Sequence, residues 1–316
     1  MRHSRALKLL LKRGALVAAA NWPAVLVQFV ASTLFNALLA VPVAGGLVLV
    51  MLIAGAVPTD VLRMEYRQII PALMGALVAQ PLALAAFVGA LALVAGGGSV
   101  LMFAVKAGTL TVLVAGERAS TAIEEPPLRV ATLVGANQFS IDRFADGVRH
   151  LFGRYLALGA LLSVAYAVAV GAYAALVLGP PVLSSLDGTL LVTLASLWLI
   201  GCITLINFGY LLIQIVVAAD DCALGDGVSR AARLLWSQSR PILGILGAIL
   251  GLMLLSTAAS VLATAALGLI AFVPFVGLAA LPLQLVAWLL RGLVFQYISL
   301  AGAAAYLRLY RLTSSD

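Results

Sequence analysis

Charged residues are scarce in this sequence. Lysine and arginine number 19 and aspartate and glutamate 12, together 10% of the 316 residues, whereas soluble domains carry about 25%. Hydrophobic residues make up 64%, and the mean hydropathy is +1.15. Because so few charged side chains cannot cover a surface that faces water, the composition argues against a soluble globular protein and indicates a membrane protein.

The sequence has only two histidines and two cysteines. His3 and His150 stand apart from any cluster of metal ligands. Cys202 lies in an apolar stretch and Cys222 in a connector, without the spacing of a zinc site or a disulfide framework. A phosphate-binding P-loop and a dinucleotide fingerprint are also absent. We therefore predict no catalytic residue, no metal and no cofactor, in a protein that is not an enzyme.

The most enzyme-like pattern is the pair Asp220 and Asp221 followed by Asp226, which is similar to the start of the CDP-alcohol phosphotransferase motif. Those enzymes hold two metal ions with further aspartates about a dozen residues on, because several carboxylates must share the ions. Here no acid follows Asp226 until Asp316. We interpret Asp220 and Asp221 as the end of a membrane helix and Asp226 as the cap of the next helix.

Long apolar runs fill most of the chain. Each exceeds the ~18 residues that indicate a membrane helix, since ~30 Å of hydrocarbon needs about 20 residues at ~1.5 Å each. They cover residues 22–58, 80–116, 151–186, 189–219 and 242–307. The sequence therefore predicts an all-α fold, a polytopic transmembrane helix bundle.

Several runs are too long for one crossing, and helix-disrupting residues lie near their middles. These residues are Pro42 with Gly45 and Gly46, Gly96 to Gly98, Gly179 to Pro181, and Pro274 with Gly277. Turns at all four places give four hairpins and eight membrane segments. Alternatively, each of the first two runs is one long, tilted helix, which gives six crossings and places Arg63 and Arg67 outside. We predict six to eight membrane segments.

Most of the charges lie in five stretches, approximately 1–21, 58–79, 117–154, 220–240 and 308–316. In the four-hairpin version these stretches share one side of the membrane. Short loops rich in lysine and arginine mark the cytoplasmic side. We therefore predict a multi-pass protein of the plasma membrane, the inner membrane of a bacterium, with both termini cytoplasmic.

An amphipathic stretch of helical period precedes each apolar run, as expected for helices that lie in the membrane interface. This pattern predicts a single integral membrane domain, 1–316, built from approximate repeat units 1–58, 59–116, 139–219 and 220–311, with a connector at 117–138. The interfacial basic residues are predicted to bind anionic lipid, at about 1 kcal/mol each. They include Arg5, Lys8, Lys12, Arg230, Arg233 and Arg240.

Several segments resemble a bacterial family of multi-helix integral membrane domains, related to the membrane domain attached to some glycerophosphodiester phosphodiesterases. The segments are 215–221, 231–236, 240–243, 271–277 and 295–297. The resemblance covers mainly the last hundred residues and implies a helical membrane fold. The soluble phosphodiesterase barrel of those enzymes is absent from this sequence, so the resemblance does not imply their activity.

Lys106 and Arg291 are basic residues inside apolar runs, where a positive charge costs ~2.5 kcal/mol or more. Gln284 shares a helical face with Arg291, and Asn207 and Gln214 line a face of an earlier helix. One interpretation is structural, with Lys106 reaching the interface and Arg291 capping backbone carbonyls. The functional alternative is a polar seam that binds an anion or a lipid headgroup.

Two functions fit these patterns. The first is a non-enzymatic scaffold or accessory subunit that binds membrane lipids and a partner membrane protein or a second copy of itself. The alternative is a transporter or lipid-handling permease whose path includes Lys106 and Arg291. A cation-coupled carrier is disfavoured, because the apolar runs hold no carboxylate besides Asp187, which we place in a turn. No nucleic-acid partner is predicted.

Overall fold

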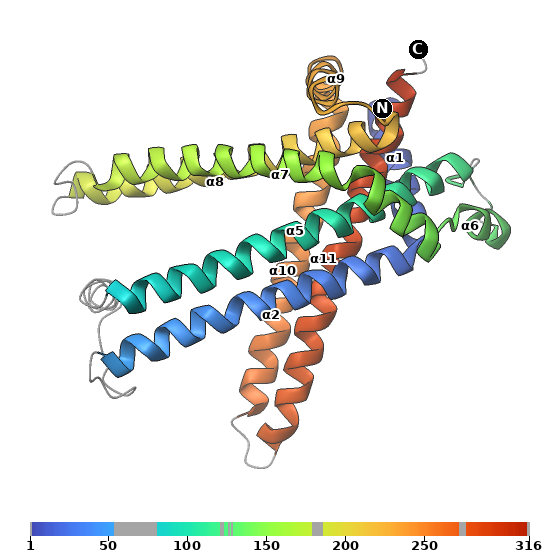
Figure 1. Cartoon of the computed structure of the whole chain (residues 1–316). Coiled ribbons are helices and arrows are strands. Elements are labelled where there is room, and N and C mark those ends of the chain that lie inside the picture. Colours follow the sequence, from blue (N-terminus) through green and yellow to red (C-terminus); the bar gives the residue numbers. More distant parts are fainter. Residues whose placement is uncertain are drawn as a thin grey trace. The chain divides into compact units, whose positions relative to one another are not determined.

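The computed structural model of the chain describes residues 2–53, 81–120, 123–125, 127, 129–178, 186–271 and 276–314, which are helical almost throughout and contain no strand (Figure 1). This confirms the predicted all-α fold. The helices are α1 (Arg2–Ala20), α2 (Trp22–Ile53), α5 (Pro81–Ala119), α6 (Val130–Ala136), α7 (Ile141–Leu178), α8 (Leu186–Asp220), α9 (Leu224–Ser237), α10 (Ser239–Ala271) and α11 (Val276–Ser314).

Among the described residues, six helices are long and apolar enough to cross a membrane. The spans are Trp22–Gly46, Leu84–Ala119, Ile141–Val177, Leu190–Asp220, Ser239–Leu269 and Pro282–Ser314. Large apolar side chains such as Leu194, Leu254 and Leu262 are exposed on these helices. Such surfaces suit lipid and not water. The protein is therefore a multi-pass helical membrane protein.

The predicted turns in the first two runs do not occur. Helix α2 continues through Pro42, and α5 continues through Gly96, Gly97 and Gly98. The turns predicted within these two runs are therefore wrong, and in the described residues each run forms one long helix, as in the six-crossing alternative. The physical reason is that lipid offers no partners for freed backbone groups, so a membrane helix persists through residues that end a helix in water.

Two glycines of these helices, Gly46 and Gly98, make room for aromatic rings. A Cβ atom on Gly98 would lie 2.0 Å from Cδ2 of Phe35, and a Cβ atom on Gly46 would lie 2.2 Å from Cε2 of Phe87. Helices α2 and α5 run side by side in Figure 1. The two glycines thus leave space for a ring from the neighbouring helix.

The other predicted turns lie between helices. Helix α7 ends at Leu178 and α8 begins at Leu186, while α10 ends at Ala271 and α11 begins at Val276. The turn residues themselves, and the second amphipathic stretch with Arg63 and Arg67, fall outside the described residues.

The contacts divide the chain into two compact units. One unit comprises Met1–Phe29 and Phe103–Asp316, and the other comprises Val30–Met102. Every site below belongs to the first unit. The single domain with four repeat units stays a prediction.

The core of the first unit forms where α1 packs against α11 and where α10 packs against α11. Small buried residues, Ala18 on α1 with Ala304 and Ala305 on α11, permit close approach. Tyrosine hydroxyls fix the packing: Tyr155 donates to the carbonyl of Gln214 at 2.9 Å. The predicted interfacial helix α1 is thus also part of the core.

The amphipathic stretches take three forms. In the first, Leu10 of α1 faces the core. In the third, Leu151 and Tyr155 are buried, and the stretch is continuous with the membrane helix α7. The fourth is a short helix, α9, and Arg240 lies beyond its end, in the first turn of α10.

Candidate functional site

The first candidate site is a small cavity between α2, α5, α8 and α11, called here the Lys106 cavity. Its volume is about 50 Å³, and its polar lining residues are Gln28, Lys106, Thr109, Gln214 and Ser299. The rest of the lining is apolar. The ammonium nitrogen of Lys106 lies 4.9 Å from the ring centroid of Tyr210, a cation–π distance.

The structure brings together two of the five residues predicted for an anion or lipid site, Lys106 and Gln214. The guanidinium of Arg291 lies 5.1 Å from the ring centroid of Phe295. Asn207 accepts a hydrogen bond from the hydroxyl of Tyr166 at 2.6 Å. Neither of these residues lines the Lys106 cavity, and Gln284 does not line it either. The predicted seam is therefore not continuous in the described residues.

Sequence reasoning missed Gln28, Thr109 and Ser299. All three are ordinary residues of membrane helices, and only their partners give them significance. One signal was present: Thr109 lies three residues after Lys106, so the two share a face of α5. Nothing local marks Gln28 or Ser299, which come from helices distant in sequence.

The second candidate site is a buried ion-pair cluster, called here the Arg13 cluster, formed by Arg13, Glu117, Ser120 and Glu124. The Nε atom of Arg13 lies 2.9 Å from both carboxylate oxygens of Glu117. Its terminal nitrogens donate to Glu124 Oε2 at 2.6 Å and to the backbone oxygen of Ser120 at 2.7 Å. Arg308 approaches Glu117 at 3.6 Å.

The charges of the Arg13 cluster are well compensated. Burial alone lowers the pKa of Arg13, but the hydrogen bonds and charges of Glu117 and Glu124 outweigh it and raise that pKa. Sequence reasoning placed both glutamates at a connector and missed the cluster. The signal was the position of Arg13, which lies on the buried face of α1 between Leu10 and Val17.

The aspartate pair joins four helices. Asp220 ends α8, as predicted, and accepts hydrogen bonds from Arg230 of α9 and Tyr310 of α11. Asp221 adopts a positive φ of 51° and accepts from Arg154 of α7 at 2.5 Å, and His150 Nε2 lies 2.8 Å from the same carboxylate oxygen. These carboxylates hold helices together.

The prediction that Asp226 caps α9 is wrong. The N-cap residue is Ala223, and Asp226 lies in the first turn of the helix. A carboxylate in the first turn still interacts favourably with the positive end of the helix dipole, which explains its position without a capping hydrogen bond.

The Asp221 contact predicts a pH dependence of stability. Hydrogen bonds from His150 and then Arg154 lower the pKa of Asp221. A lowered carboxyl pKa stabilises the fold above the unfolded value of about 3.9, and the effect is lost as pH falls through the folded pKa. We expect Asp221→Asn to cost about 1 kcal/mol or less at pH 7, because the side chain is exposed.

Thermal unfolding of the wild type and of Asp221→Asn between pH 7 and pH 3 measures this effect. The difference between their midpoints should narrow as the pH falls. A difference that stays constant over the whole range would contradict the role given to the carboxylate.

The third candidate site is a partly open cavity between α1, α10 and α11, called here the arginine cavity. Its volume is about 560 Å³. Its polar lining includes Arg13, Arg240 and Arg308 together with Glu124. Its apolar lining residues are Ala6, Leu7, Leu9, Leu10, Pro241, Leu309 and Leu312. One cavity thus offers positive charge beside a leucine surface.

The predicted interfacial basic residues are distributed around this region. Arg240 lines the arginine cavity, and Lys8 is exposed on the neighbouring α1. Lys12 donates to the backbone oxygen of Glu124 at 2.7 Å. Arg233, with Arg230, lines a separate shallow pocket beside Tyr310. Arg5 lies on α1, but its side chain is outside the described part of the structure.

The comparisons with known proteins give no relative. No protein-family model, no curated protein and no solved structure matches this chain. The resemblance to the membrane domain of glycerophosphodiester phosphodiesterases stays a prediction.

Proposed function

We propose that the protein is a non-enzymatic, lipid-binding scaffold or accessory subunit of the bacterial inner membrane, with both termini cytoplasmic. The observation that carries this proposal is the arginine cavity. A phospholipid has an anionic phosphate joined to apolar chains, and this cavity sets arginines beside leucines. A volume of about 560 Å³ lies in the range of about 300–1,000 Å³ usual for ligand pockets.

The charge of the arginine cavity supports an anionic ligand. Arg13 and Glu124 compensate each other within the cavity. Arg308 makes only a longer contact of 3.6 Å with Glu117, and Arg240 is exposed, without an acidic partner among the described residues. Guanidinium groups bind phosphate through paired hydrogen bonds. Arg240 and Arg308 are therefore the residues proposed to hold the headgroup.

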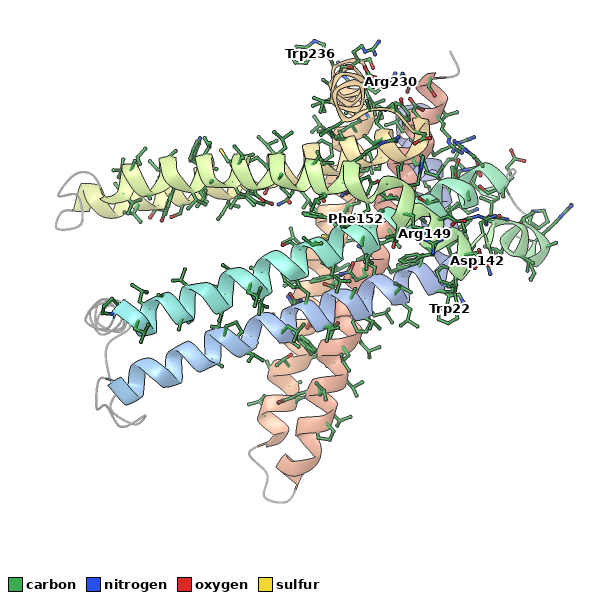
Figure 2. All side chains as sticks on the ribbon, viewed as in Figure 1. Trp22, Asp142, Arg149, Phe152, Arg230 and Trp236 are labelled. Atoms are coloured by element: carbon green, nitrogen blue, oxygen red, sulfur yellow. The ribbon has the colours of Figure 1, made fainter. Side chains whose placement is uncertain are left out.

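Helix α9 supports an interfacial position for the same region. It buries Gly227, Ala231 and Leu234 against the protein, and Leu235 and Trp236 remain exposed, the latter by 90%. Figure 2 shows Trp236 projecting away from α9. Tryptophan favours the level of the lipid headgroups, with an apolar ring and a polar N–H group. We propose that this face of α9 lies in the membrane interface.

Substitution of the two arginines proposed to hold the headgroup tests the proposal. We expect Arg240→Ala with Arg308→Ala to lose about 2 kcal/mol of binding free energy for phosphatidylglycerol, from about 1 kcal/mol per basic residue, which is roughly a thirty-fold weaker affinity. Native mass spectrometry of the protein in mild detergent, titrated with this lipid, measures the affinity.

The control for this experiment is Arg149→Ala. Arg149 has an 82% exposed side chain, pairs with Asp146 one turn away on α7, and does not line the cavity. This substitution removes the same kind of charge without touching the proposed site. Equal lipid affinity of the wild type, the double variant and this control would refute the proposal.

A second candidate function is a transporter or lipid-handling permease, favoured by one observation. The Lys106 cavity places a basic residue and several polar groups inside an apolar helix bundle. Lipid scrambling or solute flux in liposomes distinguishes the two functions. Flux that Lys106→Met abolishes would favour the permease, and an inert protein that copurifies with a membrane partner would favour the scaffold.

A further inference from the structure

The Lys106 cavity has a composition of its own, separate from the proposed lipid site. It is lined by one cation and by neutral polar side chains, without any carboxylate among its lining residues. We propose that it binds a single small anion of halide size, such as chloride, between Lys106 and Gln214. This inference does not depend on lipid binding at the arginine cavity.

The charge balance of the cavity is the first argument. In the described residues, no acidic group pairs with Lys106, whose ammonium nitrogen instead faces the ring of Tyr210, 4.9 Å from the centroid. A positive charge surrounded by apolar helices is costly unless an opposite charge accompanies it. A bound anion supplies that charge at the position where the protein does not.

An unpaired donor in the same cavity is the second argument. The side chain of Gln214 is 1% exposed, and its amide Nε2 has no hydrogen-bond partner in the part of the chain that the structure describes. A buried N–H group without an acceptor destabilises the fold. Since Nε2 belongs to a residue that lines the cavity with Lys106, one acceptor between them satisfies both groups.

The remaining polar groups are compatible with an anion. Thr109 donates its hydroxyl hydrogen to the carbonyl of Val105 at 2.8 Å, so its proton is already used. Gln28, which is 7% exposed, carries an amide N–H pair on the same cavity. Ser299 adds a hydroxyl from α11. The cavity thus offers several donors around one cation.

The size of the cavity limits the ligand. A cavity needs about 10–15 Å³ to hold one water molecule. The volume of about 50 Å³ therefore has room for a few waters or for one small anion. It is less than a tenth of the arginine cavity, at about 560 Å³, so a lipid headgroup with its chains does not fit.

Chloride binding by the purified full chain tests this inference. In sodium chloride titrated against sodium gluconate at constant ionic strength, we expect chloride to raise the thermal unfolding midpoint and to broaden the ³⁵Cl NMR line of the wild-type sample. Lys106→Met should abolish both effects. Gln214→Leu should weaken chloride binding roughly tenfold, because it removes one donor and leaves the cation.

The matched control is Arg291→Met. Arg291 is the other basic residue of the apolar runs, and it does not line the cavity, so this variant should bind chloride like the wild type. If wild-type protein shows neither response to chloride, the cavity holds only water and the inference is wrong. Equal loss in Arg291→Met and Lys106→Met would also overturn it. Lipid binding at the arginine cavity is measured in a separate experiment, so neither outcome of the chloride experiment bears on that proposal.

Discussion

Replacing Arg13 with leucine is expected to destabilise the protein by about 3–5 kcal/mol, the usual cost of removing one partner from a buried ion pair. The side chain of Glu117 is only 1% exposed, and without Arg13 its nearest cation is Arg308 at 3.6 Å. The carboxylate therefore stays buried and poorly compensated. Glu124 is less affected, because its carboxylate is partly exposed.

Two further variants show whether the unpaired carboxylate causes the loss. Arg13→Leu combined with Glu117→Leu should recover much of the stability, because both charges are removed together. Arg149→Leu removes a surface arginine whose pair with Asp146 is highly exposed, and it should change stability by less than about 1 kcal/mol. Thermal unfolding in detergent measures the stability of Arg13→Leu, of the double variant and of Arg149→Leu. Similar midpoints for Arg13→Leu and Arg149→Leu would contradict the role assigned to the cluster.

The membrane class and a range of six to eight membrane segments could be predicted from the sequence because hydropathy is a local property. A run of apolar residues identifies a membrane helix whatever its neighbours are. The turns could not be predicted as reliably. Pro42 and Gly96 to Gly98 lie within continuous helices. Lipid offers no hydrogen-bond partners to a broken helix. At Gly98, the ring of Phe35 also packs against the helix.

The candidate sites were also predictable only in part, because the sequence shows an unusual residue but not its contacts with distant helices. Lys106 stood out because any charge in an apolar run is conspicuous, but its partners come from three other helices. Arg291 was grouped with Lys106 on composition alone. It precedes Ser299 by eight residues, which is about 12 Å along α11, so it lies at a different level from the cavity that Ser299 lines.

The Arg13 cluster was missed for a related reason. Arg13 and Glu117 are 104 residues apart, and each alone resembles an ordinary charge near a membrane helix end. Their pairing follows from how α1 packs with the end of α5. The pairing also sets the charge of the arginine cavity, because Arg13 is compensated there by Glu117 and Glu124, whereas Arg308 makes only a longer contact of 3.6 Å with Glu117.

Replacing Gly14 with alanine is expected to cost about 1–3 kcal/mol or more, as overpacking of a well-packed core does. A Cβ atom on Gly14 would lie 2.3 Å from the backbone oxygen of Ala301 and 2.8 Å from the backbone nitrogen of Ala305. These are backbone atoms, so no rotamer change relieves the contact. Helix α1 would have to move away from α11, and the hydrogen bond from Tyr297 to the carbonyl of Ala15 at 3.0 Å would lengthen.

The same substitution at Gly153 provides the control, and its effect should have the opposite sign. Gly153 is exposed on α7, and a Cβ atom there would meet no described atom within 4 Å. Alanine at this position should stabilise the protein by about 0.5–1 kcal/mol, because alanine restricts the unfolded chain more than glycine does. Thermal unfolding midpoints should therefore fall for Gly14→Ala and rise for Gly153→Ala. A rise for both would mean that α1 does not pack closely on α11, and the arginine cavity between them would lose its structural basis.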